Sequence, residues 1–311
     1  MKKRKYMAIG AAVLLSGLLL FSMALTSYAS GNAYEQLKQL LDERPADNGN
    51  MTVHMDISVT DNGVTAMSTT GDIKTDKATE NTSGQIKVSG KSEEKLINFF
   101  SAENSVLFNM EGSENWYRTE ARDRNLRRDP EKRFDSQNPD MQKLRGAIMD
   151  ALMGDLKDQV TLEESNGLRT FSLELDKNNM PLIVETAFNA SGMRNKADLP
   201  DTAGITKLPE ELQELVKDLA DYHKDVEISG EKELDSISIK LTVDQDNKPV
   251  GAELSTAFSG KSTDGNTHSF VVSFKAAMSD MNTTVPDQPG IDPSKAITID
   301  PAQFGDFRKA D

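Results

Sequence analysis

The sequence predicts an α+β protein in which helices cover one face of an antiparallel β-sheet. Apolar and polar residues alternate along several segments, which is the pattern of strands with one buried face. Asn62-Gly63, Asn166-Gly167 and Asp264-Gly265 separate such segments, and these pairs are typical of tight turns between strands. Other segments carry apolar residues at helical spacing, and these segments predict the helices.

The first 29 residues have the layout of a secretory signal peptide. A basic head at residues 2–5 precedes an apolar run at residues 7–25, and Ser27-Tyr28-Ala29 places small residues where signal peptidase reads. We therefore expect cleavage after Ala29 and a secreted or cell-surface protein outside the cytoplasmic membrane. The apolar run has about 19 residues, near the lower limit of a membrane span, so an uncleaved N-terminal membrane anchor is the alternative.

Charge and cysteine content restrict the function further. The chain carries 36 basic and 50 acidic residues, a net charge of -14, which disfavours binding to nucleic acid. It contains no cysteine, which excludes disulfides, thiolate metal ligands and the lipid-modified cysteine of bacterial lipoproteins. Without disulfides, a secreted chain depends on a sizeable core. We expect a signal peptide at residues 1–29, one domain at residues 30–286 and a Pro- and Asp-containing tail at residues 287–311.

The first half of the domain predicts one helix followed by strands. Residues 33–41 form a short amphipathic helix. Residues 92–100 favour a helical turn that carries Leu96, Phe99 and Phe100 on one side. The strands are expected at residues 51–60, 64–74, 85–89, 106–110 and from 116 onward.

The second half predicts two longer helices and a hairpin before a regular meander. A helix at residues 141–156 begins after Asn138 as its cap, and a second helix spans residues 209–222. A hairpin joins residues 160–163 to residues 168–175. The meander strands, each with one apolar face, are expected at residues 236–243, 250–256 and 270–278.

This order of parts resembles a known group of proteins. A signal peptide, an N-terminal helix, polar-faced strands, an inserted helical region and a meander ending at Asn282-Thr283-Thr284-Val285-Pro286 are similar to the extracytoplasmic LolA/LppX-like half-barrel proteins of Gram-positive bacteria. The resemblance implies a strongly curved antiparallel β-sheet, a half-barrel, with helices packed on its concave face. It also implies a lipid or other apolar ligand between sheet and helices. The chain departs from many of these relatives because it has no lipobox cysteine.

The expected function is therefore noncatalytic binding at the cell envelope, with a lipid or other amphipathic ligand. The predicted cavity lining is Leu144, Ile148 and Leu152 from the helix and Phe270, Val272 and Phe274 from the last meander strand. The alternative is a structural or signalling interaction module that binds an envelope protein and no small ligand. An apolar cavity would favour the first hypothesis, and a solidly packed interface the second.

One basic segment predicts a second kind of contact. Basic residues outnumber acidic ones in residues 118–134, although the chain as a whole is acidic. Arginine pairs with phosphate through a bidentate fork. The candidate anion-binding residues are Arg122, Arg124, Arg127 and Arg128. The alternative is a solvated loop whose charges pair with one another or with the acidic body.

The sequence carries no pattern of a catalytic or metal site. His54, His223 and His268 are far apart in the sequence, and each is expected on an exposed face or a helix end. No Gly-x-Ser-x-Gly elbow and no glycine-rich phosphate loop occur. We expect no enzyme activity, no metal and no cofactor. An envelope hydrolase, with carboxylates converging in a cleft, is the least favoured alternative.

Overall fold

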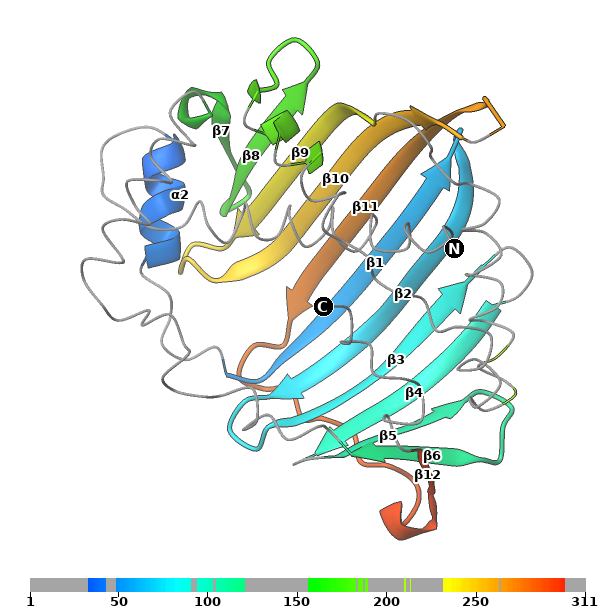
Figure 1. Ribbon diagram of the computed structural model, residues 1–311. Helices are drawn as coiled ribbons and strands as arrows, with labels where there is room; N and C mark the ends of the chain where they lie inside the picture. The colour runs from blue at the N-terminus through cyan, green and yellow to red at the C-terminus, as the bar shows by residue number, and fades with distance from the viewer. Residues whose placement is uncertain are drawn as a thin grey trace, which may run out of the picture.

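The computed structural model shows a mainly-β protein built on one sheet of 12 strands (Figure 1). The strand order is β12-β6-β5-β4-β3-β2-β1-β11-β10-β9-β8-β7. The structure describes residues 33–42, 49–90, 94–102, 105–120, 156–182, 184–186, 188–189, 210, 213, 232–262 and 264–299. The strands are β1 (Met51–Asp61), β2 (Val64–Asp76), β3 (Asn81–Ser89), β4 (Glu94–Ala102), β5 (Ser105–Met110), β6 (Trp116–Glu120), β7 (Val160–Ser165), β8 (Leu168–Asp176), β9 (Glu233–Val243), β10 (Pro249–Lys261), β11 (Thr267–Ser279) and β12 (Ile297–Ile299).

Two antiparallel meanders, β1–β6 and β7–β11, make up the sheet. They join side by side where β1 pairs with β11, with Ile57 opposite Phe274. The outermost strands β7 and β12 stay apart, so the sheet is open, and it is twisted without strong curling (Figure 1). The predicted antiparallel sheet is therefore confirmed, but its predicted strong curvature is wrong. A right-handed twist between neighbouring strands accumulates across a wide sheet without bringing its edges together.

Turn chemistry sets the hairpins. Asn62 and Gly63 both adopt positive φ, 51° and 80°, and so do Asn166 and Gly167, at 53° and 78°. Positive φ at both central residues belongs to the type I′ turn, whose twist matches that of the flanking strands. Asp61 consequently pairs with Val64 across the first turn, as the sequence predicts.

Helices contribute less than expected to the described part of the chain. Helix α2 (Ala33–Asp42) contacts β7 and β8, and residues 184–186 and 188–189 are also helical. Two short 3-10 helices are η2 (Lys157–Gln159) and η3 (Pro293–Lys295). The predicted helices at residues 141–156 and 209–222 lie outside the described residues, apart from Leu156, Glu210 and Gln213. The predicted α+β class is thus corrected to mainly β for the described residues.

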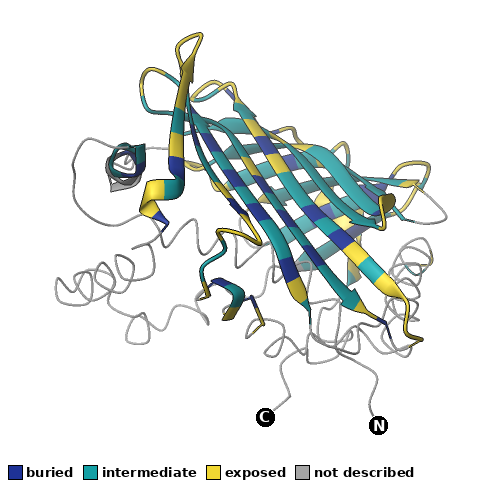
Figure 2. Ribbon diagram, turned by 90° about the horizontal axis from the view of Figure 1, so that it is seen from above, coloured by how far each residue is buried: buried dark blue, intermediate teal, exposed yellow. Residues whose placement is uncertain are grey.

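The core lies on one face of the sheet, over β7–β11. Phe171 and Val272 are each only 1 % exposed. The side chains of Tyr34, Leu37 and Leu40 from α2 close this cluster from above. Figure 2 shows buried positions recurring along the strands between less buried ones, as expected for a sheet with two different faces.

The predicted helical turn at residues 92–100 is wrong. The described part of this segment, residues 94–100, belongs to β4, whose alternate residues point to opposite faces. Ile97 and Phe99 lie on the face of the core, while Leu96 and Phe100 lie on the other face, where the Phe100 ring contacts the Trp116 ring at 5.6 Å between centroids. A strand with apolar residues on both faces has no period of two, so its sequence pattern cannot be distinguished from that of a helix.

The chain returns across the polar face of the sheet after β11. The Asn282 amide donates to the Asn50 carbonyl at 2.6 Å, and the hydroxyls of Thr284 and Thr52 are 2.8 Å apart. Asp287 reaches β3, and β12 then pairs in parallel with β6. We call residues 280–296 the C-terminal strap. The boundary predicted at residue 286 falls within it.

No helix among the described residues is long and apolar enough to cross a membrane. The predicted signal peptide lies outside the described residues.

Candidate functional site

The apolar face of the sheet continues beyond the core onto β1–β6. Cross-strand pairing aligns residues in rows on one face of a sheet. One row crosses all six strands and consists of Val53, Ile73, Gly84, Phe99, Phe108 and Tyr117. The next row consists of Met55, Gly71, Ile86, Ile97 and Met110. We call this surface the β1–β6 apolar face.

Burial differs between the two halves of this face. Over β7–β11, the side chains of α2 and of Val184 and Phe188 cover it, and most of its residues are buried. Over β1–β6, most residues of the two rows are only half-buried, Met110 and Tyr117 being buried. A half-buried face of this composition can accept an apolar ligand or packing partner.

Two glycines on this face are covered by their neighbours. A Cβ atom at Gly84 would lie 2.6 Å from the Phe99 ring, and one at Gly71 would lie 2.8 Å from Cγ2 of Ile86. The apolar side chains of β3 and β4 therefore occupy the space above both bare backbones. The face is a continuous layer of side chains there.

A histidine–aspartate pair ends this face at β1. Nδ1 of His268 lies 2.8 Å from Oδ2 of Asp61, and the two side chains are 15 % and 16 % exposed. The His268 ring also stacks on Phe270, with centroids 5.9 Å apart and planes 11° apart. The expectation that His268 is exposed is therefore wrong. Alternation within β11 places the His268 ring on the apolar face beside Phe270. Its burial depends on the neighbouring residues that cover this face, and these are not evident from the sequence around His268.

The other histidines differ from His268. His54 pairs with Asp72 at 2.9 Å on the opposite, polar face, where the side chains are 59 % and 65 % exposed. This agrees with its expected exposure. His223 lies outside the described residues.

Lys232 lies at the same end of the sheet as the pair. It is half-buried just before β9, and burial lowers the pKa of its ammonium group to about 8. Leu234, two residues later, is in the core opposite Phe258. One end of the apolar face thus carries several partly desolvated ionisable groups.

The predicted site residues divide into two groups. Phe270 and Val272 are buried in the core and Phe274 packs against it, so they face the direction that the sequence predicts. Their contact with a ligand stays a prediction. Leu144, Ile148 and Leu152, and the basic residues Arg122, Arg124, Arg127 and Arg128, lie outside the described residues.

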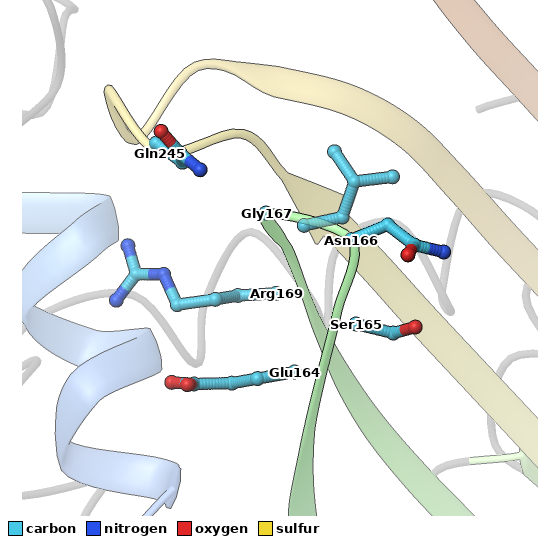
Figure 3. A pocket seen from close by; sticks show the side chains of 7 residues that line it. Glu164, Ser165, Asn166, Gly167, Arg169 and Gln245 are labelled. Carbon is cyan, nitrogen blue, oxygen red and sulfur yellow. The ribbon is translucent and has the colours of Figure 1, made fainter.

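A polar hollow of about 410 Å³ lies at the β7–β8 turn (Figure 3). Arg169 donates a hydrogen bond to the side-chain oxygen of Asn247 there. Figure 3 shows the side chains of Glu164 and Arg169 extending to the same side, toward α2. Its lining, rich in polar and charged groups, suits water or a small polar molecule better than an acyl chain. The lining residues are Glu164, Ser165, Asn166, Gly167, Leu168, Arg169 and Gln245.

Among the described residues, no group of three or more histidine, aspartate or glutamate side chains is placed to hold a metal ion.

Comparisons with known proteins leave the chain without a family. No protein family model matches the sequence, and no curated protein matches it. A solved structure from Brucella abortus, a β-barrel-like protein of domain of unknown function DUF1849, is weakly similar. It is 9 % identical, with a TM-score of 0.18, over 76 % of this chain and 100 % of that chain.

Proposed function

We propose that this is a noncatalytic binding protein that acts outside the cytoplasmic membrane and holds a lipid or other amphipathic ligand on the β1–β6 apolar face. The observation that carries the proposal is the contrast within one sheet face. Over β7–β11 most of the face is buried in the core cluster, to which α2, Val184 and Phe188 contribute, whereas over β1–β6 residues such as Ile97 and Phe99 are only half-buried. The signal-peptide layout and the resemblance to LolA/LppX-like proteins support the location and the ligand class.

The dimensions of the face suit an acyl chain. Strand β1 runs for ten residue steps from Met51 to Asp61, a span of roughly 33 Å at the usual rise per residue. An extended oleoyl chain is shorter than this span. Each methylene group that leaves water contributes about 0.8 kcal/mol, so affinity should increase with chain length.

The opposite face is suited to water and to the strap. An amide ladder crosses it, in which Gln85 donates to Asn98 at 2.8 Å and Asn98 donates to Asn109 at 3.4 Å. The strap bonds to the same face through Thr284 and Asp287. Apolar side chains also occur on this face, but Phe100 and Trp116 pack against each other there, so the β1–β6 apolar face is the more continuous surface for an apolar ligand.

Uptake of a neutral apolar fluorophore, N-phenyl-1-naphthylamine, and of 1-monooleoylglycerol tests the proposal. Ile86→Thr and Lys87→Thr form a matched pair, because these neighbours in β3 lie on opposite faces. In the absence of denaturant, where the protein is folded, Ile86→Thr should weaken uptake of both probes several-fold. Lys87→Thr should leave their uptake unchanged. A denaturant titration of each variant verifies folding.

Two results would contradict the proposal. If the wild type takes up neither probe, the ligand hypothesis fails and the alternative, an interaction module that packs this face against an envelope protein, replaces it. If both variants bind like the wild type, the ligand lies elsewhere on the molecule.

A further inference from the structure

Asp61 occupies the border between the two halves of the apolar face. It is the last residue of β1 and lies opposite Phe270 of β11, so it shares the face of the core cluster. Val59, two residues earlier on the same face, packs against that cluster. A ligand lying along β1 would therefore meet Asp61 at one end.

The two oxygens of this carboxylate have different surroundings. His268 holds Oδ2 at 2.8 Å, and the His268 ring is itself held against Phe270. Oδ1 is buried and has no hydrogen-bond partner in the part of the chain that the structure describes. A buried acceptor without a donor is destabilising, and such atoms in native proteins usually meet water or a ligand.

We infer that Asp61 and His268 form a polar anchor for the headgroup of the amphipathic ligand, and that Oδ1 of Asp61 accepts a hydrogen bond from a hydroxyl or amino group of that headgroup. This inference rests on the proposed function. The contact with His268 holds the Asp61 carboxylate in place. The headgroup therefore meets an oriented acceptor at the end of the β1–β6 apolar face, which takes the acyl chain. The headgroup class is therefore a neutral or cationic hydrogen-bond donor.

Charge sharpens this selectivity. A fatty-acid carboxylate or a phosphate beside Asp61 would place like charges together in a partly desolvated site. Lys95, opposite Val88, is the other charged residue that the register of β1–β6 places on this face, and it would favour an anionic headgroup instead. Comparing the affinities of different headgroups on the same oleoyl or oleyl chain shows whether Asp61 or Lys95 sets the headgroup preference.

The experiment measures displacement of N-phenyl-1-naphthylamine from the mature protein by 1-monooleoylglycerol, oleylamine and oleic acid. The wild type should bind the first two at least tenfold more tightly than oleic acid. Asp61→Leu should remove that preference, and binding of the fluorophore, which has no headgroup, shows whether the variant still folds and keeps the apolar face. Asp72→Leu is the matched control, because Asp72 makes the same histidine contact on the polar face at high exposure, and it should bind all probes like the wild type.

A second variant distinguishes loss of the anchor from a folding defect. Asp61→Asn keeps the shape and an acceptor oxygen but removes the charge, so it should stay folded and bind oleic acid more tightly than the wild type does. Equal wild-type affinity for oleic acid and monooleoylglycerol would overturn the anchor. An unchanged preference in Asp61→Leu would also overturn it, while fluorophore binding would still support the proposed function. Absence of all binding would instead remove the proposed function itself.

Discussion

The Phe99 ring lies directly over the backbone of Gly84, its partner in the β3–β4 register. A Cβ atom at Gly84 would lie 2.6 Å from both Cε1 and Cζ of that ring and 2.7 Å from the Asp72 carbonyl oxygen. An aromatic ring across a strand glycine covers backbone that would otherwise be solvated. This pair also adds a flat aromatic surface to the β1–β6 apolar face.

Gly84→Ala should destabilise the protein. The added methyl group must displace the Phe99 ring or separate the strands, which costs roughly 1–3 kcal/mol in overpacked sites. Gly251→Ala in β10 is the control, because its Cβ would come no closer than 3.7 Å to any neighbour, and it should cost little. Urea denaturation midpoints of both variants check this, and equal midpoints would show that Phe99 does not occupy this position.

The register of β11 predicts unequal effects at neighbouring positions. Val272 is 1 % exposed in the core, whereas Ser273 points to the opposite face, its hydroxyl 3.4 Å from that of Ser255. Val272→Ala should lower the free energy of unfolding by roughly 1–4 kcal/mol through lost burial and a residual cavity. Ser273→Ala should change it by less than about 0.5 kcal/mol. Similar losses at both sites would contradict the register.

The strap should depend on Ser83. This side chain is fully buried, and its hydroxyl accepts from the Asp287 amide at 2.8 Å and donates to the Asp287 carboxylate at 3.3 Å. Ser83→Ala leaves the Asp287 amide without that acceptor, a loss of about 1–3 kcal/mol. Amide hydrogen exchange at Ile297–Ile299 should become faster, because the strap delivers β12 to β6.

Asp292→Ala serves as the control for the strap. Asp292 accepts from the Ser294 amide at the start of η3 and makes this contact within the strap itself. Its loss should affect η3 and leave protection around Ser83 unchanged. If Ser83→Ala leaves the exchange of β12 at its wild-type rate, the strap is held by its other contacts, such as the Thr52–Thr284 pair.

Lys232 should make the free energy of unfolding increase as the pH is raised above neutrality. Burial lowers its pKa from 10.5 in the unfolded chain to about 8 in the folded protein, so the unfolded state binds more protons between these values. The free energy of unfolding therefore increases as pH rises through this window, and below pH 8 the full penalty of burying the charge remains. Lys232→Met should remove this contribution and raise stability at pH 7. Chemical denaturation from pH 7 to 10.5 measures it, and an identical pH slope in both proteins would refute the assignment.

Local chemistry in the sequence was sufficient for the hairpins and the meander. Asn62-Gly63 and Asn166-Gly167 take the left-handed conformations that their residue types favour. The alternation in β9, β10 and β11 correctly predicts their antiparallel order and the inward side of β11. These features depend on residues close in sequence, so period and turn type contain the necessary information.

The tertiary structure decided the contacts between distant segments. The pairing of β1 with β11, the strand conformation of residues 94–102, the addition of β12 to β6 and the burial of His268 beside Asp61 all depend on partners far along the chain. The apolar pattern of β4 is the same for a strand with apolar residues on both faces and for a helix, and only its pairing with neighbouring strands resolves the choice. The contact between His268 and Asp61 shows the same limit, because it forms between two strands and joins residues that are 207 positions apart in the sequence.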